Sequence, residues 1–258
     1  MKEVHDHFSH LSESYKKFRP SYPEELYLEI LKFVDKKDNC WDCGTGNGQV
    51  AVELSKYFKK VFATDISQKQ IDSAAKQKNI FYSRVRAEQS GFEENKFDLI
   101  TAAQAVHWFD FDEFNREVLR VAKDGAVLAI WGYGLIEVTD PTNKLIRHFY
   151  KDTIGTYWNL ERKHIDHAYE TIPFNFKQLN SDSKFIINQN WNLKQLEGYL
   201  NTWSGVKNYM KDHDGKNPVL EWIASLKSIW GEHEKRKSDF LFFSKPEGLK
   251  NKTFFIQI

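Results

Sequence analysis

A carboxylate followed by alternate glycines is the stretch of this chain best suited to bind a small charged ligand. Asp42 precedes Gly44, Gly46 and Gly48. Glycine lets the backbone turn sharply and lets a ligand approach without meeting a Cβ atom. A helix that begins directly after such a turn presents unsatisfied N–H groups and a partial positive charge at the same place. The stretch therefore predicts a binding loop.

A dinucleotide-binding loop is the first interpretation, and two features disfavour it. The pattern Gly-x-Gly-x-x-Gly needs a third glycine where this chain has Gln49. A pyrophosphate would also face Asp42, and two like charges about 4 Å apart repel by roughly 4 kcal/mol at an effective dielectric constant of about 20. That exceeds the ~0.3–1 kcal/mol typical of a helix terminus. The methionine end of S-adenosylmethionine (SAM) fits better, because its amine can face Asp42 and its carboxylate the N–H groups of the turn.

The elements around the loop follow the strand–turn–helix order of a nucleotide-binding α/β fold. An apolar run over 39–43 precedes the glycines, and a helix begins near Val50. Apolar runs predict further strands, and helical spacing of apolar residues predicts a helix over 111–121. The further strands are expected at 60–65, 80–85, 96–103 and 126–131. Because ligands of open α/β sheets bind at the carboxyl ends of strands, the chemistry should lie at that edge.

A second acidic residue, Asp65, ends the strand expected at 60–65. A carboxylate at this distance past the glycine loop can accept hydrogen bonds from both ribose hydroxyl groups, with Ile66 alongside the adenine. The alternative is that Asp65 caps the helix that begins near Gln68, although Ser67 can serve that purpose. Loop and acid together favour an adenosine-containing ligand.

Two motifs carry a resemblance to a known family. Asp-x-Gly-x-Gly-x-Gly over 42–48 resembles motif I of class I SAM-dependent methyltransferases. The segment 107–110, His-Trp-Phe-Asp, resembles the methyltransferase type 11 family, closest to its trans-aconitate methyltransferase-like small-molecule subgroup. The resemblance covers residues 15–133. It implies an α/β fold: a Rossmann-like, seven-stranded, mostly parallel sheet with helices on both faces, the last strand antiparallel, and a helical insertion after strand five.

The expected organisation is a single catalytic domain in three parts. Residues 1–134 form the SAM-binding core with an N-terminal cap segment, 135–183 a helical substrate-binding insertion, and 184–258 the completion of the sheet. Strands expected at 184–191 and 252–258 bring the predicted sheet to seven strands. Apolar spacing predicts helices over 193–210 and 218–230.

The resemblance also implies which residues bind SAM, with S-adenosylhomocysteine as the product. It places the methionine moiety near Tyr15 and Arg19, and the adenine near Ala87 and Glu88, although Arg86 stands where an acid is often found. The expected cofactor-binding residues are Tyr15, Arg19, Asp42, Gly44, Thr45, Gly46, Asp65, Ile66, Ala87, Glu88 and Gln104, and the expected substrate pocket contains His107, Trp108, Tyr133, Tyr157 and Trp158.

The predicted reaction is methyl transfer from SAM to a small-molecule acceptor, on a carboxylate or hydroxyl oxygen. His107 is the candidate general base, since an unperturbed imidazole titrates near neutrality; the alternative is a packed histidine that orients its neighbours. A carboxylate acceptor needs no base, and instead predicts that a cation faces the methyl group, from among Arg19, Arg147, Arg162 and the histidines of the insertion. The competing functions are a non-catalytic SAM-binding protein and a nicotinamide-dependent oxidoreductase.

Composition sets the remaining expectations. The 258 residues carry a formal net charge of +1, which gives no electrostatic reason for a nucleic-acid partner. Cys40 and Cys43 are too few for a structural zinc site, and we expect packing rather than redox chemistry from them and no metal site. No apolar run reaches the ~20 residues of a membrane span, and no secretory signal is evident. We expect a cytoplasmic monomer or homodimer that binds no membrane.

Overall fold

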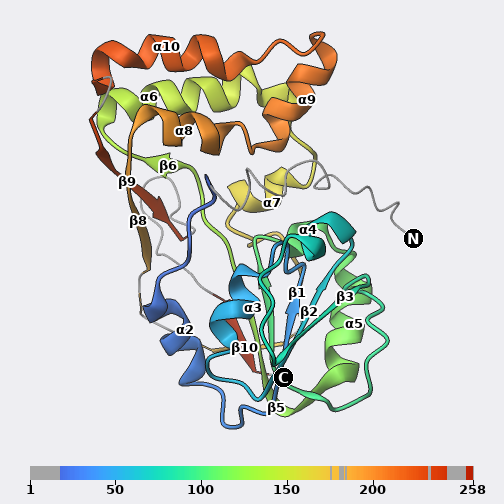
Figure 1. The fold of residues 1–258 in the computed structure, drawn as a ribbon. Coiled ribbons are helices and arrows are strands. Elements are labelled where there is room, and N and C mark those ends of the chain that lie inside the picture. The colour runs from blue at the N-terminus through green and yellow to red at the C-terminus, as the bar shows by residue number, and fades with distance from the viewer. Residues whose placement is uncertain are drawn as a thin grey trace.

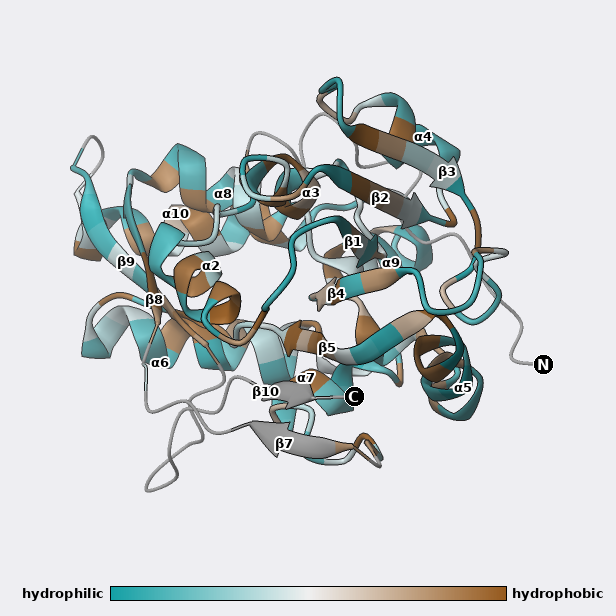
Figure 2. Ribbon diagram, turned by 90° about the horizontal axis from the view of Figure 1, so that it is seen from below, coloured by the Kyte–Doolittle hydropathy of each residue, from teal (hydrophilic) through white to brown (hydrophobic). Residues whose placement is uncertain are grey.

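The computed structural model describes residues 18–174, 176–179, 183, 185–231, 234–242 and 254–257. A large sheet forms its core, and the strands follow one another in the order β3-β2-β1-β4-β5-β10-β7 (Figure 2). Its first five members in that order are parallel: β3 (Ile80–Arg84), β2 (Lys60–Asp65), β1 (Asn39–Cys43), β4 (Phe97–Ala103) and β5 (Ala122–Trp131). β10 (Phe254–Gln257) is antiparallel to β5, and β7 (Lys177–Leu179) is antiparallel to β10. The predicted α/β fold with a mostly parallel sheet is confirmed, and its last strand is antiparallel.

The predicted seven-stranded sheet is wrong in its membership. Residues 184–191 were expected to complete it, but β8 (Ile186–Trp191) belongs to a separate antiparallel sheet with β9 (Arg236–Leu241) and β6 (Ile136–Glu137). β8 alternates between buried and exposed residues, as an antiparallel strand with one solvated face does. Three of the parallel strands, β1, β4 and β5, instead have runs of at least four consecutive buried residues. β7, which lies within the expected helical insertion, pairs with β10 instead.

Helices cover both faces of the parallel sheet (Figure 1). α2 (Glu24–Leu31) and α3 (Gln49–Leu54) pack on one face, and α5 (Phe111–Val121), at its predicted bounds, packs on the other. Side chains alternate along a strand, so Cys40 joins the first buried cluster and its neighbour Trp41 the second. Two short helices, α4 (Gln68–Asp72) and η1 (Val106–Trp108), follow β2 and β4 at the carboxyl edge.

A second layer, which we call the cap, lies beyond the carboxyl ends of the parallel strands (Figure 1). It contains the three-stranded sheet and the helices α6 (Asp140–His148), α8 (Leu193–Leu200), α9 (Ser204–Asp212) and α10 (Pro218–Trp230). The cap also includes the short helices η2 (Phe149–Thr153), η3 (Gly155–Tyr157) and α7 (Arg162–Asp166) and the residues between them. The helix expected over 193–210 is divided, because Trp203 has an extended backbone and precedes α9. Within the described ranges, we find no helix with the length and apolarity that a bilayer span requires.

A buried acidic residue on α5 ties that helix to the loop between β3 and β4. The Glu117 carboxylate accepts hydrogen bonds from the N–H and hydroxyl of Ser90 and from two guanidinium nitrogens of Arg120, at 2.9 and 2.7 Å. Arg120 also donates to the carbonyl of Phe92 at 2.7 Å. Burial raises the pKa of Glu117, but the hydrogen bonds from Arg120 and Ser90 outweigh burial, so its pKa is lowered. The network therefore stabilises the fold above the ordinary carboxyl pKa and loses this contribution as the pH falls through the lowered value.

We predict that Glu117→Gln lowers the free energy of unfolding by about 1.5–3 kcal/mol near pH 7, because it removes charge-assisted hydrogen bonds at a buried site. Urea unfolding followed by circular dichroism measures this change. The matched control is Glu113→Gln, since Glu113 pairs with Arg116 on the exposed side of the same helix. The control should change stability by less than about 0.5 kcal/mol. Equal losses in both variants would contradict the role given to Glu117.

Candidate active site

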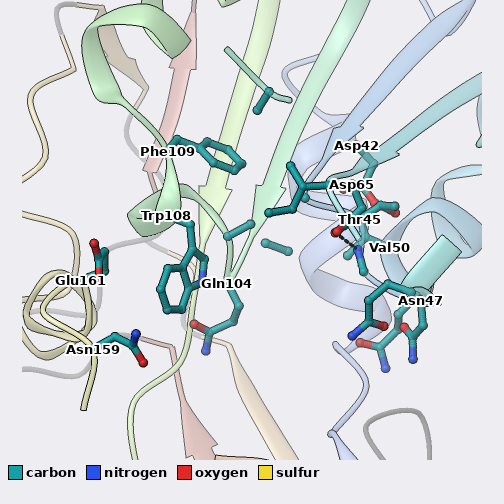
Figure 3. A pocket seen from close by; sticks show the side chains of 18 of the residues that line it. Asp42, Thr45, Asn47, Val50, Asp65, Gln104, Trp108, Phe109, Asn159 and Glu161 are labelled. Atoms are coloured by element: carbon teal, nitrogen blue, oxygen red, sulfur yellow. Dashed lines mark hydrogen bonds between the residues drawn. The ribbon is translucent and has the colours of Figure 1, made fainter. Parts of the chain in front are cut away.

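A large cavity of about 650 Å³ lies between the carboxyl ends of the parallel strands and the cap segment 156–161. Figure 3 shows Asp42, Thr45 and Asp65 on one side of this cavity, Asn159 and Glu161 on the other, and Gln104 and Trp108 between them. All but two of the predicted cofactor-binding residues line this cavity: Asp42, Gly44, Thr45, Gly46, Asp65, Ile66, Ala87, Glu88 and Gln104. Arg19 lies elsewhere, and Tyr15 falls outside the described residues.

The glycine loop has the backbone that its sequence predicts. Gly44, Gly46 and Gly48 have φ angles of +62°, +56° and +80°, a region that favours glycine. A Cβ atom on Gly44 would lie 2.6 Å from the Cβ atom of Ala105, so no side chain fits there. A Cβ atom on Gly46 would have no heavy atom within 4 Å. The loop thus leaves open space at Gly46, where the chain lines the cavity.

Asp42 is a buried carboxylate that lines the large cavity with only 1% of its surface exposed. Burial raises its pKa to about 6, although hydrogen bonds from the hydroxyl groups of Thr45 (2.5 Å) and Thr101 (2.7 Å) favour the ionised form. The negative charge of Asp65 also raises it. A ligand with a positive charge beside Asp42 would favour ionisation, so the site suits a cationic group.

Asp65 both lines the cavity and fixes the loop beside it. Its carboxylate accepts hydrogen bonds from the N–H of Gly46 and the N–H of Ser67, each at 2.8 Å. The Ser67 side chain makes no capping hydrogen bond at the start of α4. Asp65 therefore satisfies a backbone donor at that helix start, as the alternative interpretation expected, and still borders the cavity.

Glu88 links the segment after β3 to the segment that follows η1. Its carboxylate accepts a hydrogen bond from the N–H of Asp110 at 2.9 Å and lies 3.3 Å from Nε of Arg86. Arg86, which departs from the family pattern, is thus the ionic partner of Glu88. Together these contacts fix the edge of the cavity near Ala87.

Gln104 joins the ends of β4 and β5 at the centre of the site. It has a φ of +51°, which is uncommon for a residue with a side chain and clusters at functional sites. Its N–H donates to the carbonyl of Trp131 at 2.9 Å, and its side-chain amide to the carbonyl of Tyr133 at 3.0 Å. These two hydrogen bonds hold the strained residue in place.

A small cavity of about 60 Å³ adjoins the large one. Gln104, Trp108, Trp158 and Asn159 line both cavities, and we call these four residues the partition. Of the expected substrate pocket, His107, Trp108, Tyr133 and Trp158 line the small cavity, whereas Tyr157 lines only the large one. The small cavity also contains Arg19, which the sequence analysis assigned to the cofactor, and Arg162.

Aromatic rings hold the two arginines of the small cavity. The Arg162 guanidinium carbon lies 4.8 Å from the ring centre of Trp158 and 5.2 Å from that of Tyr150, and its Nε donates to the Tyr150 hydroxyl at 2.8 Å. The Nη1 atom of Arg19 donates to the Tyr133 hydroxyl at 3.2 Å. Among the described residues, no aspartate or glutamate lines this cavity. The lining of the small cavity therefore includes two guanidinium groups and, among the described residues, no carboxylate.

Tyr157 and Trp158 were predicted from the sequence, but the other residues of the cap that close the large cavity were not. Segment 156–161 and residues of α9 line it, although they lie far from the motifs along the chain. Their residue types carry no signal, since only tertiary packing brings them to the strand ends. The missed residues on this side are Thr156, Asn159, Leu160, Glu161, Asn208, Lys211 and Asp212.

The remaining sequence candidates line neither cavity. Cys40 and Cys43 are buried free thiols, and burial raises the pKa of each well above its ordinary value, which disfavours the reactive thiolate. In the part of the chain that the structure describes, no group of three or more His, Cys, Asp or Glu side chains is arranged to hold a metal ion.

Known proteins are similar to this chain in sequence and fold. Residues 41–130 match the family of methyltransferase domains. A provisionally named methyltransferase of Dictyostelium discoideum is 40% identical over 223 residues, which cover 84% of this chain and 83% of that protein. A provisionally named SAM-dependent methyltransferase of Saccharomyces cerevisiae is 24% identical over 254 residues, which cover 84% of this chain and 87% of that protein. A solved structure from Anaeromyxobacter dehalogenans, provisionally named a type II methyltransferase, has a TM-score of 0.81 and 30% identity, covering 93% of this chain and 98% of that chain.

The residues at the strand ends fit the family's cofactor in charge and in space. A buried carboxylate, an open glycine loop and a second carboxylate line a cavity of about 650 Å³. With the 40% identical relative, these observations establish that the chain belongs to the class I SAM-dependent methyltransferases, and that SAM is its cofactor.

Proposed function

We propose that this methyltransferase transfers the methyl group of SAM to an oxygen atom of a small, negatively charged molecule. One observation carries the proposal: a small cavity lined by two guanidinium groups adjoins the large cavity across a partition of four side chains. The acceptor would occupy the small cavity and the space beside the partition. The oxygen would be that of a carboxylate or a hydroxyl group.

The large cavity would hold SAM through the residues at the strand ends. Asp42 would face the amine of the methionine moiety, and the N–H groups of the glycine loop would face its carboxylate. Asp65 would accept hydrogen bonds from the ribose hydroxyl groups, with Ile66 and Ala87 beside the adenine. When bound, SAM supplies a methyl group on a positively charged sulfur, which an acceptor oxygen can attack directly.

The charges of the two cavities support this division. Acidic residues line the large cavity, as a ligand with a cationic amine and a sulfonium requires, and Lys211 is the one basic residue among its described lining. The acidic residues are Asp42, Asp65, Glu88, Glu161 and Asp212. Arg19 and Arg162 line the small cavity. Opposite charges on the two sides of the partition favour a cationic ligand on one side and an anionic ligand on the other.

Arg162 is the better placed of the two arginines to bind an anion. Its Nε is engaged by Tyr150 and lies 3.6 Å from a carboxylate oxygen of Asp166. Its terminal nitrogens Nη1 and Nη2 donate no hydrogen bond to any described residue. A guanidinium that stacks on aromatic rings keeps its planar donors in a fixed orientation for a carboxylate.

The partition would align the acceptor and exclude water. Trp108 and Trp158 are large apolar surfaces, while Gln104 and Asn159 offer amide groups at the same place. Good alignment can lower a barrier by up to ~7–11 kcal/mol. Since the methyl group of SAM is already activated, alignment is the main contribution that we assign to the chain.

We predict that the affinity for SAM decreases as the pH falls below about 6. Asp42 has its pKa raised to about 6, and only its ionised form attracts the amine of the ligand. Each pH unit below that value should weaken binding by up to about tenfold. Calorimetric titration between pH 5 and pH 8 measures this. Asp42→Asn should bind weakly at every pH in this range. An affinity that is constant with pH in the unaltered protein would contradict the role of Asp42.

We predict that Arg162→Gln lowers kcat/KM for an anionic acceptor by about 10–100-fold, the equivalent of one charge-assisted hydrogen bond. The assay follows the release of S-adenosylhomocysteine with a panel of small carboxylic acids, alcohols and amines. Arg147→Gln is the matched control, because Arg147 is exposed on α6 and lines neither cavity. The affinity for SAM should be unchanged in both variants.

Two outcomes of the same assay would overturn the proposal. If neutral alcohols or amines were methylated as efficiently as acids, and Arg162→Gln had no effect, the proposal of an anionic acceptor would be wrong. Binding of SAM without transfer to any compound of the panel would favour the non-catalytic alternative.

A further inference from the structure

A buried side-chain amide at the edge of the large cavity lacks a hydrogen-bond partner in the part of the chain that the structure describes. Gln70, on α4, is 2% exposed and lines this cavity. Its Oε1 atom is covered and accepts no hydrogen bond from a described residue. Its Nε2 atom donates no hydrogen bond to a described residue either. The polar end of this side chain is therefore unsatisfied within the described fold.

An unsatisfied amide at a buried position needs a specific reason. Buried polar side-chain atoms in folded proteins nearly always have a hydrogen-bond partner, because a covered donor or acceptor loses its bonds to water. The two residues before Gln70 on α4 are exposed, so the helix places this one side chain inward and leaves Gln68 and Lys69 in solvent. An apolar side chain could fill the same volume without an unpaired amide. The amide thus indicates a partner from outside the chain, either a ligand or an ordered water molecule.

The position of Gln70 within the cavity favours the ligand. Asp65 and Ile66, which come shortly before α4, line the same cavity, and so does Ala87, which follows β3. α4 contacts both β2 and β3. Asp42 lies on β1, which pairs with the opposite edge of β2. Gln70 therefore belongs to the side of the cavity near β2 and β3, whereas Asp42 belongs to the side near β1.

We infer that Gln70 binds the adenosine part of SAM, through hydrogen bonds that its amide makes only when the large cavity is filled. This inference rests on the placement of the ligand in the proposed function, with the ribose at Asp65, and does not depend on the anionic acceptor. Adenosine offers donors, the adenine amine and the ribose hydroxyl groups, and acceptors, the ring nitrogens. A glutamine amide has an acceptor oxygen and donor N–H groups, and it can pair with both kinds.

The substitution Gln70→Met tests the inference, because methionine has nearly the same length and lacks the amide. In calorimetric titration of the full-length protein, the Kd for S-adenosylhomocysteine should rise by about tenfold, as expected when a buried polar group loses its partner on the ligand. The melting temperature without ligand should be unchanged or higher, since an unpaired amide has been removed from a buried site. A residue that only supports the fold would show a lower melting temperature.

Gln68→Met is the matched control. Gln68 lies on the same helix, is exposed and lines neither cavity, and its Nε2 donates to Oδ1 of Asp72 at 2.8 Å. The control should change the Kd by less than about twofold. The same small change in Gln70→Met would overturn the inference and assign the amide to ordered water. Gln70→Leu is the second variant, and a lower melting temperature of both Gln70 variants would also overturn it, because the amide would then have a partner in the free protein.

Methylthioadenosine distinguishes the two parts of the ligand, because it contains the adenosine but neither the amine nor the carboxylate of the methionine part. Gln70→Met should weaken the binding of this compound by the same factor as the binding of S-adenosylhomocysteine. Asp42→Asn should weaken the binding of S-adenosylhomocysteine alone. A loss in Gln70→Met that disappears with methylthioadenosine would overturn the inference. Equal losses of both ligands in Asp42→Asn would instead contradict the proposed placement of the ligand, so the two failures are distinguishable.

Discussion

The structure depends on a carboxylate buried at the end of a strand. Asp42 is almost fully covered, and its ionised form is maintained against burial by the hydroxyl groups of Thr45 and Thr101. A buried charge without a partner is costly, so this position favours a ligand that brings a positive charge. The parallel sheet explains the location, because strand carboxyl ends meet at one edge and bring Asp42 and Asp65 to one cavity. The cap then covers that edge.

The site can be understood as two electrostatic environments that share a wall. Carboxylates surround the large cavity, and guanidinium groups line the small one. The partition that separates them is built from both layers of the molecule: Gln104 and Trp108 come from the core, and Trp158 and Asn159 from the cap. The proposed transfer from a cationic donor to an anionic acceptor would use this arrangement. It also explains why the cap and core must be packed against each other for the site to be complete.

The sequence predicts the core well because local rules determine it. The positive φ angles at Gly44, Gly46 and Gly48 and the bounds of α5 follow from residue type and spacing. β8 was assigned to the wrong sheet, because a strand pattern does not state which partner it pairs with. β5 begins at Ala122 and not at the predicted residue 126. The register of its pairing with β4 shifts between Phe97 and Leu99, so the strand continues through Gly125, which the sequence indicated as a turn. The placement of Arg19 and Arg162 in one cavity, and of Tyr169 against His107, arises from contacts distant in sequence and has no local signature.

A crystal structure of the protein with S-adenosylhomocysteine would test most directly whether the two cavities meet at the reacting centre. We predict that the amine of the ligand lies within hydrogen-bond distance of Asp42 and that its ribose hydroxyl groups contact Asp65. The sulfur would then face the partition at Gln104 and Trp108, toward the small cavity. A ligand whose sulfur points away from the partition, or whose adenosine occupies the small cavity, would contradict it.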